Sequence, residues 1–559
     1  MVASLVSASL SNATYSSPKV FDWGSIVPSK QLEYHNCYDG FKCARLLVPL
    51  DWLNLEDERT VAIAIVKLPA AVPDDDPTFG GTVIFNPGGP GVSGVNTAVK
   101  GAARSVQQKL TDKPGIRYYE ILSFDPRGVG NTAPVSDCFR SNDFARNAWI
   151  LEDRGKGSLT SGNTAISYGL GLMKFYSNRC KADEQLNKTL EYVGTPSVAR
   201  DMVEMIDKID ELRKSEAGQR LEDKNNPVPR IQYLGFSYGT ALGNTFASMF
   251  PGRVGRMVLD GVVDAKDYYN GDGSTALKDT DKMFDEFWRG CFDASVTNCP
   301  FRLSYKTPKE AQQRFWEWIT GRDGLNRYPV AVPSANGSPL VIRGSDVLVA
   351  AGDALHDPVK KFQPLALALY EGMIKGNLTL MASLVDGTVA KVGDMCEIGS
   401  QQFKPEGTWA VACSDSIDLR NHDIDFWNKH IQKQEKISRL FGPFFATFRF
   451  ACSSWPFRSK WEYRSPFVTP APRSEPLYFA RPAAPLLFLS NRLDPVTPLS
   501  SARAMAKGHP ESGLLIQQSM GHTTWGGGPS RCTWEAVRNY FDDGRIQAKE
   551  FDCPADCDP

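Results

Sequence analysis

The 559-residue chain lacks the features that would place it in a membrane or on a nucleic acid. It has no apolar run of about 18 residues, so no segment is predicted to span a bilayer. Lysine and arginine number 63 against 64 aspartates and glutamates, with no basic stripe and no acidic tail. Neither nucleic acid nor an anionic membrane surface is therefore an expected partner. The expected partner is a small or neutral molecule.

Cysteine is also scarce, since 12 cysteines are too few to scaffold a chain of this length. Their number is even, however, and some lie close together in sequence, as in Cys37/Cys43, Cys291/Cys299 and Cys553/Cys557. Structural disulfides are therefore expected. No CxxC pair occurs and no histidine lies near these cysteines at ligand spacing, so we expect no zinc site. We expect no other metal and no cofactor either.

The amino-terminal stretch 1–17 lacks the basic segment and the unbroken apolar core of a secretory signal peptide. Glycosylation sequons begin at Asn12, Asn187, Asn336 and Asn377. The cysteines and sequons favour secretion, whereas the missing leader favours a cytoplasmic protein. The sequence leaves the compartment open, and it leaves the oligomeric state open as well.

The stretch 231–250 predicts a strand, a sharp turn and a helix. Its turn, GFSYG at 235–239, matches the pattern GxSxG, in which two glycines leave room for a serine held in a strained conformation. The free N–H groups at the start of the helix would favour negative charge beside that serine. Ser237 is therefore the candidate nucleophile. GxSxG also occurs by chance in surface loops, so the interpretation depends on the other segments.

Short, nearly continuous apolar segments alternate with helical patterns around this turn, as in a parallel sheet covered on both faces. The first two expected strands should pair antiparallel, a helix at 195–213 should pack on the sheet, and a helix at 532–541 should close the fold. The turn after the fourth strand is expected to be structural, with Asp125 paired to Arg127. The expected strands besides 231–236 are 43–52, 60–68, 81–86, 118–125, 253–263, 485–490 and 513–518.

A glycine-rich loop, PGGPG at 87–91, follows the strand 81–86. Its glycines would let the backbone approach a ligand closely. In hydrolases with a GxSxG turn, a loop of this kind supplies one oxyanion donor and the residue after the nucleophile supplies the other. The candidates are the N–H groups of Gly89 and Tyr238. The alternative is an ordinary Pro/Gly turn.

Ser237 needs a base, because an unassisted hydroxyl is hardly ionised at neutral pH. Among six histidines, only His522 follows the carboxyl end of an expected strand. The imidazole in turn needs a carboxylate, for which Asp494 is the first choice and Asp260 the alternative. The order serine, aspartate, histidine along the chain is that of the α/β-hydrolase fold. The other histidines lie before the sheet, in the helical region or before the last strand: His35, His356, His422, His430 and His509.

Between about 265 and 480 the alternation of strands and helices stops, and helical patterns rich in aromatic residues take over. These aromatics predict a second core, and a cap over the active site would show the same features. We therefore expect an extension at 1–40, a first part of the core at 41–264, a mainly helical cap at 265–480 and a second part of the core at 481–559.

In combination, these motifs resemble the tripeptidyl-aminopeptidase-like branch of the proline iminopeptidase family of serine exopeptidases. The resemblance covers most of residues 40–555. It implies an α/β-hydrolase core, an inserted helical cap and cleavage of short units from free peptide N-termini. It also implies a triad of Ser237, Asp494 and His522, with Gly89 in the oxyanion loop. The segments that carry it are GFSYGT (235–240), NPGGPGVSG (86–94), FDPRGVG (124–130), ACSDS (412–416), CSSWP (452–456), SNRLDPVTP (490–498), SMGHTTW (519–525) and CTWEAV (532–537).

Together these residues predict a serine hydrolase that forms an acyl-enzyme on a peptide or a small-molecule acyl substrate. The most specific expectation is an exopeptidase acting at peptide N-termini. One alternative is an esterase, thioesterase or amidase acting on a specialised metabolite. Another is a non-catalytic binding protein on a hydrolase scaffold, although a silent relative has no chemical reason to keep serine, acid and base together.

Overall fold

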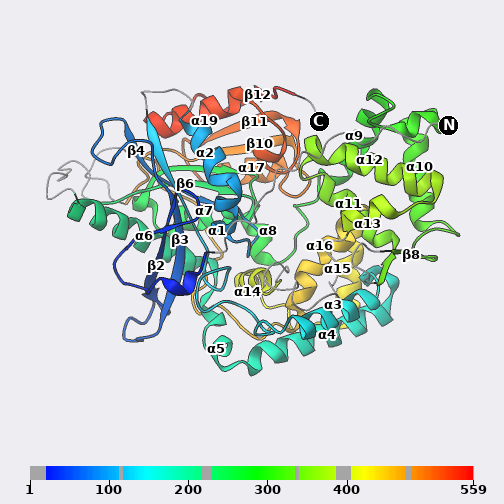
Figure 1. Ribbon diagram of the computed structural model, residues 1–559, viewed down its shortest axis with the longest axis horizontal. Helices are drawn as coiled ribbons and strands as arrows, with labels where there is room; N and C mark the ends of the chain where they lie inside the picture. The colour runs from blue at the N-terminus through cyan, green and yellow to red at the C-terminus, as the bar shows by residue number, and fades with distance from the viewer. Residues whose placement is uncertain are drawn as a thin grey trace.

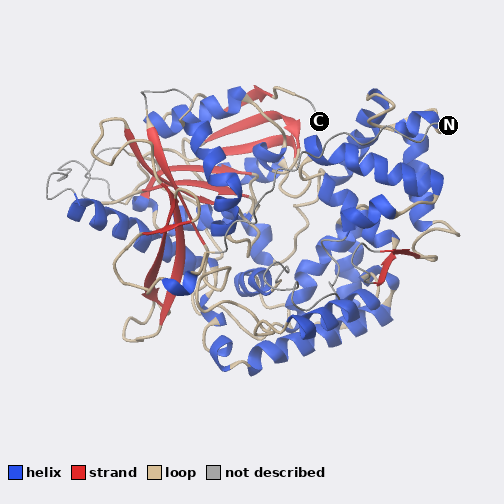
Figure 2. Cartoon of the chain, in the orientation of Figure 1, coloured by secondary structure: helices blue, strands red, loops and turns tan. Residues whose placement is uncertain are grey.

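The computed structural model describes residues 21–111, 117–216, 228–333, 339–385, 405–473 and 480–557. Its centre is a ten-stranded sheet with the strand order β1-β2-β3-β5-β4-β6-β7-β10-β11-β12, drawn in red in Figure 2. The strands are β1 (His35–Cys37), β2 (Phe41–Pro49), β3 (Thr60–Leu68), β4 (Phe79–Asn86), β5 (Tyr118–Phe124), β6 (Ile231–Phe236), β7 (Val254–Asp260), β10 (Leu487–Leu493), β11 (Gly513–Met520) and β12 (Glu550–Pro554).

The sheet is antiparallel from β1 to β3 and where β3 meets β5, and it is parallel from β5 to β12. The loops after β4, β6, β7, β10 and β11 consequently leave the same edge of the sheet. This arrangement confirms the predicted α/β-hydrolase fold class, and the expected strands are present with boundaries that differ by a few residues.

Two strands at the ends of the sheet, β1 and β12, were not expected. Both are short and each has only one buried residue, so neither shows the continuous apolar run of a buried strand. Because β12 adds to the sheet after the last helix, the expectation that a helix at 532–541 closes the fold is wrong.

Helices cover both faces of the sheet (Figure 1). On one face, α6 (Thr195–Glu216), α7 (Tyr238–Met249) and α17 (Leu499–Ala506) contribute to a common core. On the other face, α2 (Ala103–Leu110) and α19 (Arg531–Asp543) do the same. The helix expected at 195–213 is confirmed as α6, and its apolar residues at helical spacing, Val198, Met202, Met205, Ile206 and Ile209, are all buried.

A mostly helical part lies beside the sheet, at the right and bottom of Figure 1. The segment between β7 and β10 supplies most of it, with one hairpin of β8 (Val330–Pro333) and β9 (Pro339–Ile342). Its helices are α8 (Ala265–Asn270), α9 (Thr280–Asp293), α10 (Pro308–Thr320), α11 (Gly344–Ala354), α12 (Pro358–Lys375), α13 (Thr379–Val385), α14 (Glu406–Asp415), α15 (Ile424–Ile437) and α16 (Gly442–Phe450).

Helices from before the strand β6 also join this part. α3 (Asp143–Gly155) and α4 (Asn163–Ala182) share a buried core with α14, α15 and α16, in which Ile166 and Tyr176 lie with Trp427 and Phe450. Two separate segments of the chain therefore build the helical part. The division into domains at 264 and 480 stays a prediction. The remaining short α-helices are α1 (Gly94–Thr97), α5 (Glu184–Asn187) and α18 (Thr523–Gly526).

Five disulfides are present among the described residues, which agrees with the expectation from the cysteine count: Cys37–Cys43, Cys138–Cys180, Cys291–Cys299, Cys413–Cys452 and Cys532–Cys553. Cys553 on β12 bonds to Cys532 on the adjacent helix α19, not to its sequence neighbour Cys557, which is exposed and free.

Of the sequon asparagines, Asn187 and Asn377 are exposed, whereas Asn12 and Asn336 lie outside the described residues.

The expected pairing of Asp125 with Arg127 is wrong. Arg127 instead forms a two-point ion pair with Asp201 of α6, at 2.6 Å from Nε to Oδ2 and 2.7 Å from Nη2 to Oδ1. Asp125 accepts hydrogen bonds from the backbone N–H groups of Val95 and Asn131. Sequence proximity was misleading here because the guanidinium extends away from its own turn to the buried face of a later helix.

We predict that replacing Asp201 with asparagine lowers the free energy of unfolding by about 3–5 kcal/mol, because it leaves the Arg127 charge buried and unpaired. The two side chains are only 1% and 0% exposed. Unfolding in guanidinium chloride measures the change. The exposed pair Arg314–Glu317 is the matched control, and Arg314→Gln should leave the midpoint where it is. Equal shifts for the two variants would contradict the structural role of the buried pair.

Candidate active site

Ser237 occupies the sharp turn between β6 and α7, with φ 54° and ψ −123°. Its N–H donates to the carbonyl of Asp260 at 3.0 Å, which joins the turn to the neighbouring strand β7. A Cβ on Gly235 would lie 2.5 Å from the Gly239 carbonyl oxygen, and one on Gly239 would lie 2.7 Å from the Asn86 carbonyl oxygen. Only glycine fits at these two positions, so the turn has the geometry that the sequence pattern predicts.

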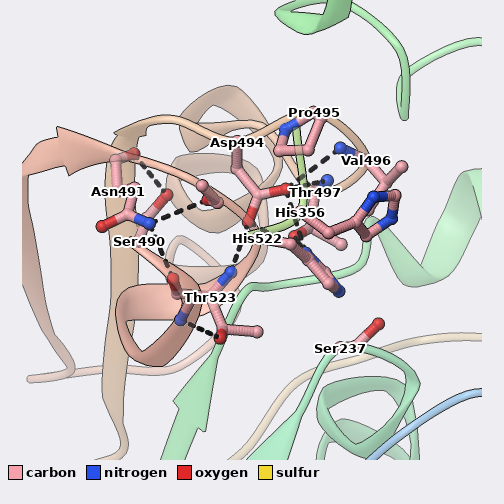
Figure 3. A network of polar contacts seen from close by, with 12 residues as sticks. Ser237, His356, Ser490, Asn491, Asp494, Pro495, Val496, Thr497, His522 and Thr523 are labelled. Carbon is pink, nitrogen blue, oxygen red and sulfur yellow. Dashed lines mark hydrogen bonds and ion pairs between the residues drawn. The ribbon is translucent and has the colours of Figure 1, made fainter. Parts of the chain in front are cut away.

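His522 and Asp494 lie at the ends of the neighbouring strands β11 and β10. His522 Nδ1 is 3.1 Å from each carboxylate oxygen of Asp494 (Figure 3). Backbone N–H groups hold the buried carboxylate in place, from Val496 at 3.0 Å, Thr497 at 2.8 Å and Thr523 at 2.9 Å. Because the carboxylate can only accept, Nδ1 carries the proton and Nε2 keeps its lone pair.

The two groups shift each other's pKa. Burial lowers the pKa of His522, but the charge of Asp494 and its hydrogen bond outweigh burial, so the pKa lies above the ordinary value of 6.5. Burial raises the pKa of Asp494, and the charge of His522 with the backbone hydrogen bonds reverses this effect, so the pKa lies below its ordinary value. The carboxylate therefore stays charged where the imidazole titrates.

The three predicted residues come together at the carboxyl edge of the parallel strands. Figure 3 places Ser237 on the turn below the imidazole of His522, with no hydrogen bond between them. Catalytic hydrogen bonds are often long before substrate binds, so the arrangement is compatible with a nucleophile and its base. An imidazole oriented by a carboxylate above a strained serine can activate the hydroxyl for attack on a carbonyl carbon.

Asp260, the alternative acid, has a different place in the site. Its carboxylate accepts from the backbone N–H and the hydroxyl of Thr524, both at 2.8 Å. Burial raises its pKa to about 6, and the Thr524 hydrogen bonds oppose this shift. Thr524 lies two residues after His522, so Asp260 contacts the loop that carries the imidazole, and the carboxylate within hydrogen-bond distance of the ring is that of Asp494.

His356, from the segment between α11 and α12, was not expected at this site. Its carbonyl oxygen accepts from the His522 N–H at 3.0 Å, and the two rings lie 5.3 Å apart. The sequence places His356 only in the helical region, since nothing in its local pattern indicates a contact with a loop more than a hundred residues later. His509 is buried elsewhere and bonds Asn244 at 2.8 Å.

The glycine-rich loop after β4 lies against the turn that carries Ser237. A Cβ on Gly88, whose φ is 98°, would lie 2.8 Å from Ser237 Cβ and 3.1 Å from Tyr238 N. Gly89 follows with φ 110°, again in the region that favours glycine. The two candidate oxyanion donors, Gly89 and Tyr238, therefore belong to segments in close backbone contact.

Comparison with known proteins shows which protein families the chain matches. Residues 81–297 match the family described as alpha/beta hydrolase fold, and residues 438–553 match the family described as TAP-like protein. These matches assign an α/β-hydrolase domain and a TAP-like domain to the chain. The resemblance found in the sequence is confirmed, and the chain is a hydrolase of the serine hydrolase and peptidase type.

Curated proteins similar to this chain align over most of its length. "Serine protease Hip1" of Mycobacterium tuberculosis is 25% identical over 526 residues, which cover 92% of this chain and 87% of that protein. "Tripeptidyl aminopeptidase" of Streptomyces lividans is 24% identical and covers 86% of this chain and 78% of that protein. "Carboxylesterase B" of Mycobacterium tuberculosis is 25% identical, with coverages of 92% and 86%.

The solved structures similar to this chain include two hydrolases. Esterase E22 covers 90% of this chain and 100% of its own, at 10% identity and a TM-score of 0.34. A meta-cleavage product hydrolase from Pseudomonas fluorescens IP01 covers 87% of this chain and 95% of its own, at 11% identity and a TM-score of 0.29. Scores of this size do not establish a fold, so the assignment rests on the sheet order and the family matches.

Two kinds of feature are absent from the part of the chain that the structure describes. No helix in the described ranges is both long and apolar enough to cross a membrane. Nor do three or more histidine, cysteine, aspartate or glutamate side chains gather there in a group that could hold a metal ion.

We predict that Asp494→Asn lowers kcat by about four orders of magnitude, as loss of the orienting carboxylate does in a serine protease triad. In wild type, kcat/KM should rise with pH and reach half of its maximum above pH 6.5, because only neutral His522 accepts a proton. In the variant, burial still lowers the pKa of His522 while the opposing charge is gone. The rising limb of the residual activity should therefore move to lower pH, as pH profiles of kcat/KM would record.

Asp260→Asn is the matched control for this prediction and should cause a far smaller loss of kcat. Loss of activity in Asp260→Asn with Asp494→Asn still active would show that the acid has been assigned to the wrong residue.

We also predict that Gly88→Ala lowers kcat by about two orders of magnitude or more, because its methyl group would push the glycine-rich loop away from Ser237 and Tyr238. Gly101→Ala is the matched control, since Gly101 also has a positive φ of 119° but no atom within 4 Å of the methyl group that the substitution would add. Steady-state kinetics and melting temperatures of both variants distinguish the effect of the collision, which only Gly88→Ala introduces, from that of backbone strain, which both variants introduce. Equal kinetic losses in the two would contradict the prediction.

Proposed function

We propose that the chain is a serine exopeptidase that releases short units from free peptide N-termini. The proposed triad is Ser237 as nucleophile, His522 as base and Asp494 as the acid that orients the base. The N–H groups of Gly89 and Tyr238 would form the oxyanion hole. The observation that carries the proposal is the bond between His522 Nδ1 and buried Asp494 at the same sheet edge as the strained Ser237 turn.

The acylation step follows from this geometry. Ser237 Oγ attacks the carbonyl carbon of the scissile bond while its proton moves to His522 Nε2, the nitrogen that Asp494 leaves with a lone pair. The carbonyl oxygen becomes an oxyanion next to the N–H groups of Gly89 and Tyr238. When the tetrahedral intermediate collapses, His522 gives its proton to the leaving amine and the acyl group stays on Ser237.

Deacylation repeats these steps with water. His522 Nε2 takes a proton from water, whose oxygen attacks the acyl carbon and forms a second oxyanion in the same place. The proton then returns to Ser237 Oγ as the ester bond breaks and the acid product leaves. Asp494 stays charged throughout and stabilises the imidazolium that forms in each half-reaction.

The choice of a peptide substrate rests on the relatives named as a serine protease and a tripeptidyl aminopeptidase. A second candidate function is an esterase, thioesterase or amidase acting on a specialised metabolite. It is favoured by the relative named carboxylesterase B, which covers 92% of this chain, as the serine protease does. Both functions would use the same triad.

Hydrolysis of paired substrates tests the proposal. Wild type and Ser237→Ala are given short peptide amides with free or acetylated N-termini, beside simple aryl esters. We expect wild type to cleave only the peptides with free N-termini among the amides, and Ser237→Ala to lose several orders of magnitude in kcat. Ester turnover with every peptide left intact would favour the metabolite hydrolase, and full activity of Ser237→Ala would contradict both candidates.

A further inference from the structure

We propose that helix α14 (Glu406–Asp415) sets the position of both oxyanion donors, with Thr408 near its start and Asp415 at its end acting as positioning residues. The inference rests on the proposed function, because the donors Gly89 and Tyr238 matter only if Ser237 attacks a carbonyl group. It gives a role to the segment ACSDS, which is one of the motifs that carry the family resemblance and which the triad leaves unused.

Asp415 is the centre of a buried hydrogen-bond network. Its carboxylate accepts from Thr195 N at 2.8 Å, from Thr195 Oγ1 at 2.6 Å and from Tyr268 OH at 3.0 Å. The side chain is 4% exposed. All three partners donate, so the Asp415 carboxylate is the acceptor at the end of the network. Burial raises the pKa of Asp415 to about 6, and the Thr195 hydrogen bonds oppose the shift.

The network continues from Thr195 to the residue beside the nucleophile. Thr195 Oγ1 lies 2.5 Å from the hydroxyl of Tyr238. Since Thr195 donates its one hydroxyl proton to Asp415, the Tyr238 hydroxyl must donate to Thr195. A directed chain therefore runs from Tyr238 through Thr195 to Asp415, and it restrains the residue whose backbone N–H is the proposed oxyanion donor.

The other end of α14 contacts the glycine-rich loop. Thr408 Oγ1 donates to the carbonyl oxygen of Pro90 at 2.8 Å. A Cβ on Gly91 would collide with the backbone of Thr408 and lie 2.8 Å from its Oγ1, so the loop lies directly on the first turn of the helix. Pro90 follows Gly89, and the contact thus restrains the glycine-rich loop one residue after the second proposed donor.

α14 is itself held from several sides. Glu406 accepts from Arg146 Nη1 at 2.8 Å, and Arg146 also pairs with Asp137. The Cys413–Cys452 disulfide joins α14 to the segment CSSWP, and Arg458 Nη1 donates to the Cys413 carbonyl oxygen at 2.8 Å. A helix of 10 residues is about 15 Å long and stiff. It can hold two loops at a constant separation, as an oxyanion hole requires.

Substitutions along the chain from Tyr238 to Asp415 test the inference. Tyr238→Phe and Asp415→Asn should each lower kcat about 10-fold, less than the loss of a whole oxyanion donor, and leave KM within about twofold. The double variant should be no slower than the slower single variant, because both changes break one chain. Thr195→Val should lower kcat as much as Tyr238→Phe and Asp415→Asn do. Thr195→Ser keeps the hydroxyl and should have the kcat of wild type.

Two further measurements separate positioning from stability. The affinity of phenylboronic acid, which forms a tetrahedral adduct on an activated serine, should fall about as much as kcat in the same variants. Tyr540→Phe is the matched control, since it removes another buried hydroxyl, bonded to Pro485 O at 2.6 Å, on the opposite face of the sheet. It should leave kcat and boronate affinity unchanged.

The second end of α14 and its disulfide give independent variants. Thr408→Val should lower kcat with KM unchanged, and so should Cys413→Ser/Cys452→Ser. Cys37→Ser/Cys43→Ser is the control pair, because this disulfide joins β1 to β2 away from the site. Its kcat should equal that of wild type.

The inference would be overturned if these variants had lower melting temperatures but the kcat and boronate affinity of wild type. The role of α14 would then be structural only. A raised KM at unchanged kcat would overturn the inference too. If wild-type turnover did not depend on Ser237, the proposed function would fail, and Ser237→Ala makes that outcome distinguishable from the other two.

Discussion

The parallel pairing of β4, β6, β7, β10 and β11 is the constraint on which the whole site depends. Parallel strands end at one edge, so the loops that carry Ser237, Asp494 and His522 meet there although they are far apart in sequence. The backbone hydrogen bond from Ser237 to Asp260 and the Thr524 contacts of Asp260 join these loops to one another. These hydrogen bonds tie the loops of the site to the sheet below them.

Buried charges hold the helical part together, join it to α6 and fix α6 to the turn after β5. Glu406 and Asp415 of α14, and Asp201 of α6, each lie among donors that satisfy their oxygens. An unpaired buried carboxylate would cost several kcal/mol, so these contacts are strongly favoured over any arrangement that separates the partners. The same contacts specify how α14 sits against the glycine-rich loop and the nucleophile turn, which links folding to the chemistry of the site.

Sequence patterns were sufficient for the fold class, and they named the three residues of the proposed triad, which stays a prediction. Buried parallel strands are continuously apolar, and GxSxG encodes a turn that only glycine permits, so both are visible locally. The edge strand β12 was missed because its buried residues are few. The partner of Arg127 was missed because an ion pair between distant segments leaves no local pattern. For the same reason the sequence left Asp494 and Asp260 as alternatives until the structure showed that Asp494 contacts His522.

The most direct measurement is the site of covalent labelling by a fluorophosphonate, which reacts only with an activated serine hydroxyl. Peptide mapping by mass spectrometry should find one adduct, on Ser237, and labelling should be lost in His522→Ala, which keeps the hydroxyl but removes its base. Labelling of a different serine, or labelling of Ser237 at the same rate without His522, would contradict a site built from Ser237, His522 and Asp494.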